Sequence, residues 1–168
     1  MKAFRAVRGS IVVAAAAGVL ALSGCGTANT AAIVNGMRIT ERDAQVAVEQ
    51  VHQAQPDSTL DTPNAVASLI MAQFINQVAN ASGKGLSDSA AAAAVPQIVN
   101  PTPTTLQLVK ASLAWSQLTS AEQTQAVDAA AKAHITLNPR YGTFNAKRIQ
   151  FEKSAPNWLK ASGTSAGG

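Results

Sequence analysis

The hydrophobic pattern of the chain opens with an unbroken apolar run from Ile11 to Leu22. This run holds 12 residues, fewer than the ~20 that a membrane-spanning helix needs. It follows a start that carries three cations and no acidic residue, Lys2, Arg5 and Arg8. A positive start and a short apolar segment that ends in small residues are typical of a secretory signal peptide. We therefore expect residues 1–24 to be such a signal, and a retained transmembrane helix is the disfavoured alternative.

A different pattern, of two short apolar pieces around Asn35-Gly36, follows the signal. Asn-Gly favours the type I′ turn, because both residues tolerate a positive φ. We therefore expect a β-hairpin over residues 31–39. The small and polar residues 25–30 before it are typical of a flexible tether.

Apolar residues then recur at helical spacing between capping residues and prolines. Thr40 is placed to cap one helix, and Thr62-Pro63 is a cap followed by a proline suited to the first turn. Thr119 and Glu122 match the capping box, in which the two side chains bond to each other's backbone. The expected helices cover residues 40–55, 62–82, 87–95, 104–117 and 119–133.

The second of these helices carries the broadest apolar stripe, and the last section of the chain carries most of the aromatic residues. The candidate residues for the core or for an apolar groove are Leu69, Ile70, Phe74, Val78, Leu113 and Trp115. After a predicted strand at Ile135–Leu137, we expect the aromatic residues Tyr141, Phe144, Phe151 and Trp158 to fold back and close the core. The fold class is therefore mainly α, with one domain over residues 31–160 and a disordered tail over 161–168.

The residues at the end of the apolar run, Leu22-Ser23-Gly24-Cys25, resemble the lipobox of bacterial lipoproteins. In that motif a diacylglyceryl group is transferred to the cysteine thiol, and a peptidase then cuts before the cysteine. Cys25 is the only cysteine of the chain, so it has no partner for an internal disulfide. We expect the mature protein to begin at Cys25 and to be held on the extracytoplasmic face of the cell membrane by acyl chains, of which two give stable anchoring.

Removal of the signal also removes the basic character of the chain. Without Lys2, Arg5 and Arg8, ten basic residues face nine acidic ones, a net charge of +1. The longest basic cluster left is Lys147-Arg148, so we expect no nucleic-acid partner. Much of the apolar content is alanine, which favours helices but buries little area per residue, and this composition leaves room for an open apolar groove.

The mature chain offers no catalytic constellation. His52 and His134 have no further ligands at helical spacing, so we expect no metal site. There is no Gly-x-Ser-x-Gly elbow and no dinucleotide-binding loop. We therefore expect a protein that is not an enzyme and that has no cofactor apart from the lipid on Cys25.

The segment AAIVNGMRITERDA, residues 31–44, resembles the opening of SurA-type periplasmic chaperones, and residues 138–144, NPRYGTF, resemble an ending of actinobacterial lipoproteins with that domain. The resemblance implies that the first strand, at Ile33-Val34, pairs with the strand at Ile135–Leu137 around a helical bundle. Such foldases often carry a parvulin-type isomerase domain, but too few residues follow Phe144 for one here.

The resemblance implies a chaperone-like protein that binds extended segments of unfolded or partly folded exported polypeptides. The alternative is a structural lipoprotein that reuses the fold to hold one specific partner in the cell envelope.

Overall fold

The structure, a computed structural model, describes residues 29–152. Several predicted features lie outside this range. They are the signal peptide over residues 1–24 with its lipobox residues Leu22, Ser23 and Gly24, the lipidation residue Cys25, the aromatic residue Trp158 and the tail over residues 161–168. The described part forms a mainly helical domain with two small antiparallel sheets, as the hydrophobic pattern predicts.

The larger sheet joins the two ends of the domain. It contains β1 (Thr30–Val34), β2 (Met37–Thr40) and β3 (Ile135–Leu137) in the order β2-β1-β3, with both pairs antiparallel. The predicted Asn35-Gly36 turn connects β1 to β2 with both residues at positive φ, 49° and 87°. Ile33 pairs with Thr136, so the expected pairing of the N- and C-terminal strands is confirmed. Because Thr30 already belongs to β1 and is buried, the fold begins inside the segment predicted to be a tether.

Five helices lie between β2 and β3 in the described part of the chain, close to the predicted boundaries. Each begins at a residue whose side chain accepts a hydrogen bond from a backbone N–H of the first turn. For the second helix this residue is Asp61 rather than the predicted Thr62, and for the fourth it is Thr102. The helices are α1 (Glu41–Ala54), α2 (Thr62–Ala81), α3 (Asp88–Ala94), α4 (Pro103–Gln117) and α5 (Ser120–Lys132).

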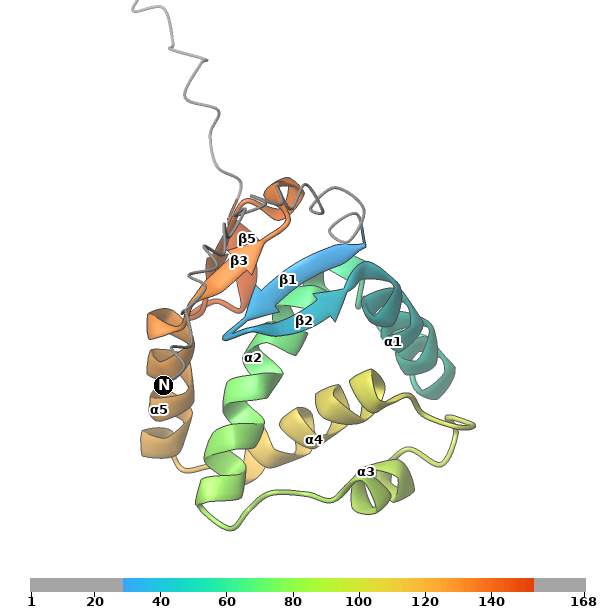
Figure 1. Cartoon of the computed structure of the whole chain (residues 1–168). Coiled ribbons are helices and arrows are strands. Elements are labelled where there is room, and N and C mark those ends of the chain that lie inside the picture. Colours follow the sequence, from blue (N-terminus) through green and yellow to red (C-terminus); the bar gives the residue numbers. More distant parts are fainter. Residues whose placement is uncertain (1–28, 153–168) are drawn as a thin grey trace, which may run out of the picture.

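Helix α2 runs through the centre of the fold, with the larger sheet, α1, α4 and α5 arranged around it (Figure 1). Its buried residues cover nearly the whole helix surface because neighbours surround it, and they include Leu69, Ile70, Phe74 and Val78. Helix α3 is different: among the described elements it has extensive contact only with α4, at the lower edge of the fold in Figure 1.

The end of the described chain folds back over the core, as the aromatic residues predict. The short 3-10 helix η1 (Pro139–Tyr141) leads into a hairpin of β4 (Thr143–Asn145) and β5 (Gln150–Glu152), which the sequence did not predict. Tyr141 is buried, and its ring centroid lies 4.7 Å from that of Phe151, which in turn lies 5.9 Å from that of Phe144.

Candidate functional site

An open hollow of the described surface lies between the end of α1, α2, α4 and the α3 segment. It has a volume of about 350 Å³, within the range of small-molecule and side-chain binding pockets. We call it the main groove. Its aliphatic lining includes Val51, Leu60, Val95, Leu108, Val109 and Leu113.

A second hollow of about 220 Å³ adjoins the main groove at the crossing of α2 and α4. The two hollows share Ser68, Leu108 and Ser112, and the second adds Met71, Ile75, Trp115 and Ile149 to the apolar lining. On α4, Leu108, Ser112 and Trp115 follow one another at helical spacing, so they lie on one face of the helix. We call the two hollows together the extended apolar groove.

The composition of α3 explains why the main groove is open. This helix consists of Asp88, Ser89 and five alanines, so its methyl groups leave the space beside α4 unfilled. Pro96 ends the helix, because the residue before a proline disfavours helical backbone angles. An ion pair of 2.7 Å between Lys110 and Asp88 holds the start of α3 against α4.

No charged side chain of the described residues lines either hollow of the extended apolar groove. The polar groups of its lining are the side chains of Gln55, Ser68 and Ser112. A ligand here would therefore gain affinity from buried apolar area and shape, with a few hydrogen bonds to fix its orientation.

The candidate residues predicted from the sequence divide between the core and the groove. Four of them, Leu69, Ile70, Phe74 and Val78, are buried in the core and line neither hollow. Leu113 lines the main groove and Trp115 lines the second hollow. The sequence therefore predicted the central helix correctly, but it did not predict which face of each helix stays open.

Ile149 completes the wall of the second hollow from an unusual backbone conformation. Its φ is 51°, a left-handed value that is uncommon for a β-branched residue. The residue occupies the last position of the β4–β5 loop, where glycine or asparagine is the usual choice. Such strain costs of the order of 1–3 kcal/mol and persists only where surrounding contacts hold it. Here the side chain is half-buried against the core cluster beside Trp115.

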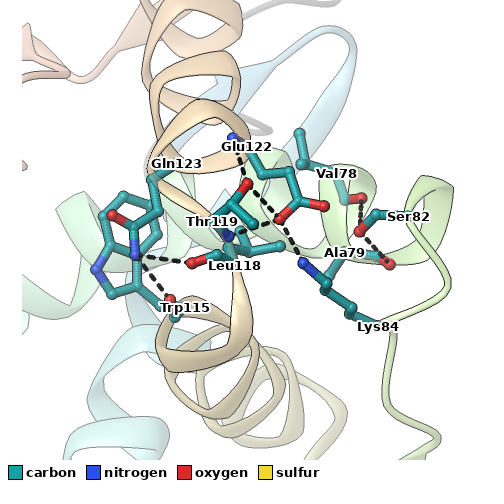
Figure 2. A network of polar contacts seen from close by, with 9 residues as sticks. All are labelled: Val78, Ala79, Ser82, Lys84, Trp115, Leu118, Thr119, Glu122 and Gln123. Carbon is teal, nitrogen blue, oxygen red and sulfur yellow. Dashed lines mark hydrogen bonds and ion pairs between the residues drawn. The ribbon is translucent and has the colours of Figure 1, made fainter.

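A polar network fixes the corner between α4 and α5, next to the second hollow (Figure 2). Glu122 Oε2 accepts hydrogen bonds from the Thr119 backbone N–H at 2.6 Å and from Lys84 Nζ at 2.5 Å. The Lys84 contact, followed by the backbone and hydroxyl of Thr119, lowers the pKa of Glu122 from 4.5 to about 2. Gln123 Nε2 donates to the Trp115 carbonyl at 3.0 Å, which ties the backbone of the groove tryptophan to α5. The sequence predicted the capping box but not its connection to Lys84.

A second polar cluster lies at the start of α1, whereas the main groove lies at the end of this helix. Tyr141 Oη donates a hydrogen bond to Glu41 Oε2 at 2.6 Å and accepts one from Arg140 Nη2 at 3.1 Å. Arg140 Nη2 also forms an ion pair with Glu41 Oε2. Burial, and then the hydrogen bond to Glu41, raise the pKa of Tyr141. Nothing in the sequence around Glu41 indicates a partner near residue 141.

Over residues 29–152 the structure shows neither a metal site nor a membrane-spanning helix. Within that range no group of three or more His, Cys, Asp and Glu side chains is placed to hold a metal ion. His52 and His134 are both exposed. Within the same range no helix is both long and apolar enough to cross a membrane.

Comparison of the chain with protein-family models, with curated proteins and with solved structures found no match.

Proposed function

We propose that the protein is a non-catalytic lipoprotein, anchored through Cys25, that binds unfolded or partly folded exported polypeptides in the extended apolar groove. The observation that carries this proposal is an open hollow of about 350 Å³ that continues into a second one, with no charged lining among residues 29–152. A concave hollow lined mainly by apolar side chains, with a few polar groups, is the usual form of a binding pocket.

The size and chemistry of the groove fit a few aliphatic or aromatic side chains of an extended chain. Burial of each such side chain contributes roughly 1.5–3 kcal/mol, and the ordering of the bound segment offsets part of this gain. Two or three anchored side chains therefore give weak binding that exchanges quickly. Weak binding through shape and apolar contact suits many different clients, whereas a single specific partner would be expected to need placed polar groups.

The main groove and the point where the chain enters the fold lie at opposite ends of α1. The Asn29 carbonyl accepts a hydrogen bond from the Glu41 backbone N–H at 2.9 Å, so the chain enters the fold at the start of α1. Val51 and Ala54, which line the main groove, lie ten to thirteen residues further along α1, or ~15–20 Å at the helical rise. The main groove therefore lies at the end of α1 away from the point where a chain from Cys25 would enter the fold.

We further propose that the domain is SurA N-terminal-like. The topology that supports this is the hairpin of β1 and β2, whose first strand pairs with β3 on the far side of a helical segment. This is the arrangement that the resemblance of residues 31–44 and 138–144 implies.

The proposal is tested by binding of a permanently unfolded chain, reduced and carboxymethylated lactalbumin, to the lipidated protein in nanodiscs. Val109→Asp places a carboxylate in the main groove, and we expect it to weaken binding at least tenfold. Val99→Asp is the matched control, because Val99 is 77% exposed and lines neither hollow. Equal binding by both variants and the unchanged protein would overturn the proposal.

A further inference from the structure

A third hollow lies at the opposite end of α1 from the main groove, between the first turns of α1 and α2 and the C-terminal hairpin. Its volume is about 440 Å³, and it shares no lining residue with the extended apolar groove. We call it the Arg140 cavity. Its lining consists of Gln45, Thr62, Pro63, Arg140, Tyr141 and Phe151.

Arg140 is held in place but keeps most of its hydrogen-bonding capacity. Its contacts with Glu41 Oε2 and Tyr141 Oη both use Nη2. A guanidinium has five N–H donors, and the described residues engage none of those on Nε and Nη1. The side chain is 56% exposed, and Arg140 lines the cavity. A guanidinium whose orientation is fixed loses little entropy when it binds a carboxylate through two parallel hydrogen bonds.

The rest of the cavity wall is apolar with two neutral polar groups. Phe151 packs against Tyr141, with ring centroids 4.7 Å apart, and Pro63 adds a further apolar surface. Gln45 and Thr62 supply an amide and a hydroxyl. Among the described residues, Arg140 is the only charged one of the lining, and its ion-pair partner Glu41 is buried.

We propose that the Arg140 cavity binds a carboxylate carried on an aromatic or aliphatic body. The carboxylate pairs with the Nε and Nη1 donors of Arg140, and the apolar body packs against Phe151 and Pro63. Since Glu41 balances the charge of Arg140, recognition depends on short-range hydrogen bonds rather than on long-range attraction. Two sources share this chemistry, a free carboxylic acid and the C-terminal residue of a polypeptide. The inference is independent of the proposed function, because it concerns other residues and another ligand.

The experiment measures binding of N-acetylphenylalanine and of its amide to the full-length lipidated protein in nanodiscs by ligand-observed NMR. The acid is expected to bind at least tenfold more tightly than the amide, and Arg140→Gln is expected to abolish this preference. Because Arg140 also contacts Glu41, circular dichroism must first show that the variant is folded. Equal binding of the acid and the amide by the unchanged protein would overturn the proposal.

A pair of variants at Gln45 tests the site without disturbing the Glu41 cluster. Gln45 is exposed on α1, so both replacements are compatible with the fold. Gln45→Glu is expected to weaken binding of the acid at least threefold, and Gln45→Lys is expected to tighten it. Gln53→Glu and Gln53→Lys are matched controls on the same helix, eight residues away and beyond the screening length at 0.15 M salt. If the two Gln45 variants shift the affinity in the same direction, or not at all, the cavity does not bind the carboxylate.

The source is distinguished by comparing phenylpropionate with the peptide Gly-Gly-Phe. Equal affinity supports a free carboxylic acid as the ligand, and a clear preference for the peptide supports the end of a polypeptide chain. Absence of binding by both probes overturns the proposal.

Discussion

The hydroxyl of Tyr141 lies 2.6 Å from Glu41 Oε2, a contact between residues 100 positions apart in the chain. This hydrogen bond joins the first turn of α1 to the segment that follows β3. The N- and C-terminal parts of the domain are therefore linked twice, by this contact and by the pairing of β1 with β3. The Glu41 side chain is buried, and Oε1 has no hydrogen-bond partner among the described residues. The buried charge of this carboxylate is therefore stabilised only through Oε2, by Tyr141 Oη and Arg140 Nη2 among the described residues.

Replacement of Tyr141 by phenylalanine removes one of these donors and leaves the ring in place. We expect Tyr141→Phe to lower the free energy of unfolding by about 1–3 kcal/mol, because a buried carboxylate loses a hydrogen bond. Thr136→Val is the matched control, since it deletes an exposed hydroxyl on β3. Urea unfolding followed by circular dichroism measures both, and equal stabilities would contradict this account of the contact.

The same contact predicts a dependence on alkaline pH. The folded state raises the pKa of Tyr141 above its usual value near 10, so folding favours the protonated phenol. The stabilisation is therefore complete below pH 10 and is lost as the pH rises through the pKa of the folded state. Tyr141→Phe is expected to lessen the loss of stability above pH 10, and an unchanged slope would contradict the assignment.

Glu122 predicts the opposite dependence, at acid pH. Its pKa falls from 4.5 to about 2 in the folded state, chiefly through the hydrogen bond from Lys84. Its stabilisation is therefore present above pH 4.5 and is lost as the pH falls toward 2. Glu122→Gln is expected to flatten this part of the stability curve, which urea unfolding at several pH values measures. Glu49→Gln removes one exposed carboxylate from α1 as a control, and an effect of similar size there would contradict the prediction.

Much of the fold could be predicted because its signals are local. Asn35-Gly36 specifies its turn through two neighbouring residues, and Thr119 and Glu122 specify the start of α5 across one turn. The hairpin of β4 and β5 was missed because its left-handed loop position holds Ile149, which carries no turn signal. The pairing of the two chain ends was expected from the resemblance of residues 31–44 to a known family, and local pattern alone did not indicate it.

The sites were harder to predict than the fold, since they depend on side chains that meet from distant elements. The main groove exists because the alanines of α3 fail to fill the space beside Val109 and Leu113 on α4. The cluster of Glu41, Arg140 and Tyr141 joins residues about 100 positions apart. Neither arrangement has a signature in the spacing of residues along the chain.

The end of α2 provides a test of backbone conformation. Gly83 follows the helix with a φ of 73°, and the next N–H, from Lys84, bonds back to the Ala79 carbonyl at 2.8 Å. We expect Gly83→Ala to lower the free energy of unfolding by about 1 kcal/mol, because a left-handed φ is unfavourable for residues with a Cβ. Gly83→Asn is expected to cost less, since asparagine tolerates this region. Thermal unfolding compares the two, and an equal or reversed order would contradict the argument.

The proposed anchor predicts a loss of lipidation that is specific to one residue, Cys25. Cys25 is the only cysteine of the chain, so Cys25→Ser removes the only thiol that can accept a diacylglyceryl group. We expect the variant to incorporate no radiolabelled palmitate and to keep its signal peptide, since the lipoprotein peptidase cuts before a lipidated cysteine. Ser23→Ala, within the same motif, is expected to retain the label. Palmitate incorporation by Cys25→Ser would show that the motif has been misread.

The central claim is that the extended apolar groove binds unfolded exported chains, and crosslinking from within the groove tests it most directly. A photoreactive phenylalanine analogue at Leu113 reports on the main groove, and the same analogue at the exposed Val99 is the control. In intact cells that carry the lipidated protein, we predict that position 113 captures many unrelated exported proteins and position 99 few. Capture of one dominant partner at position 113, or the same pattern at both positions, would contradict the claim.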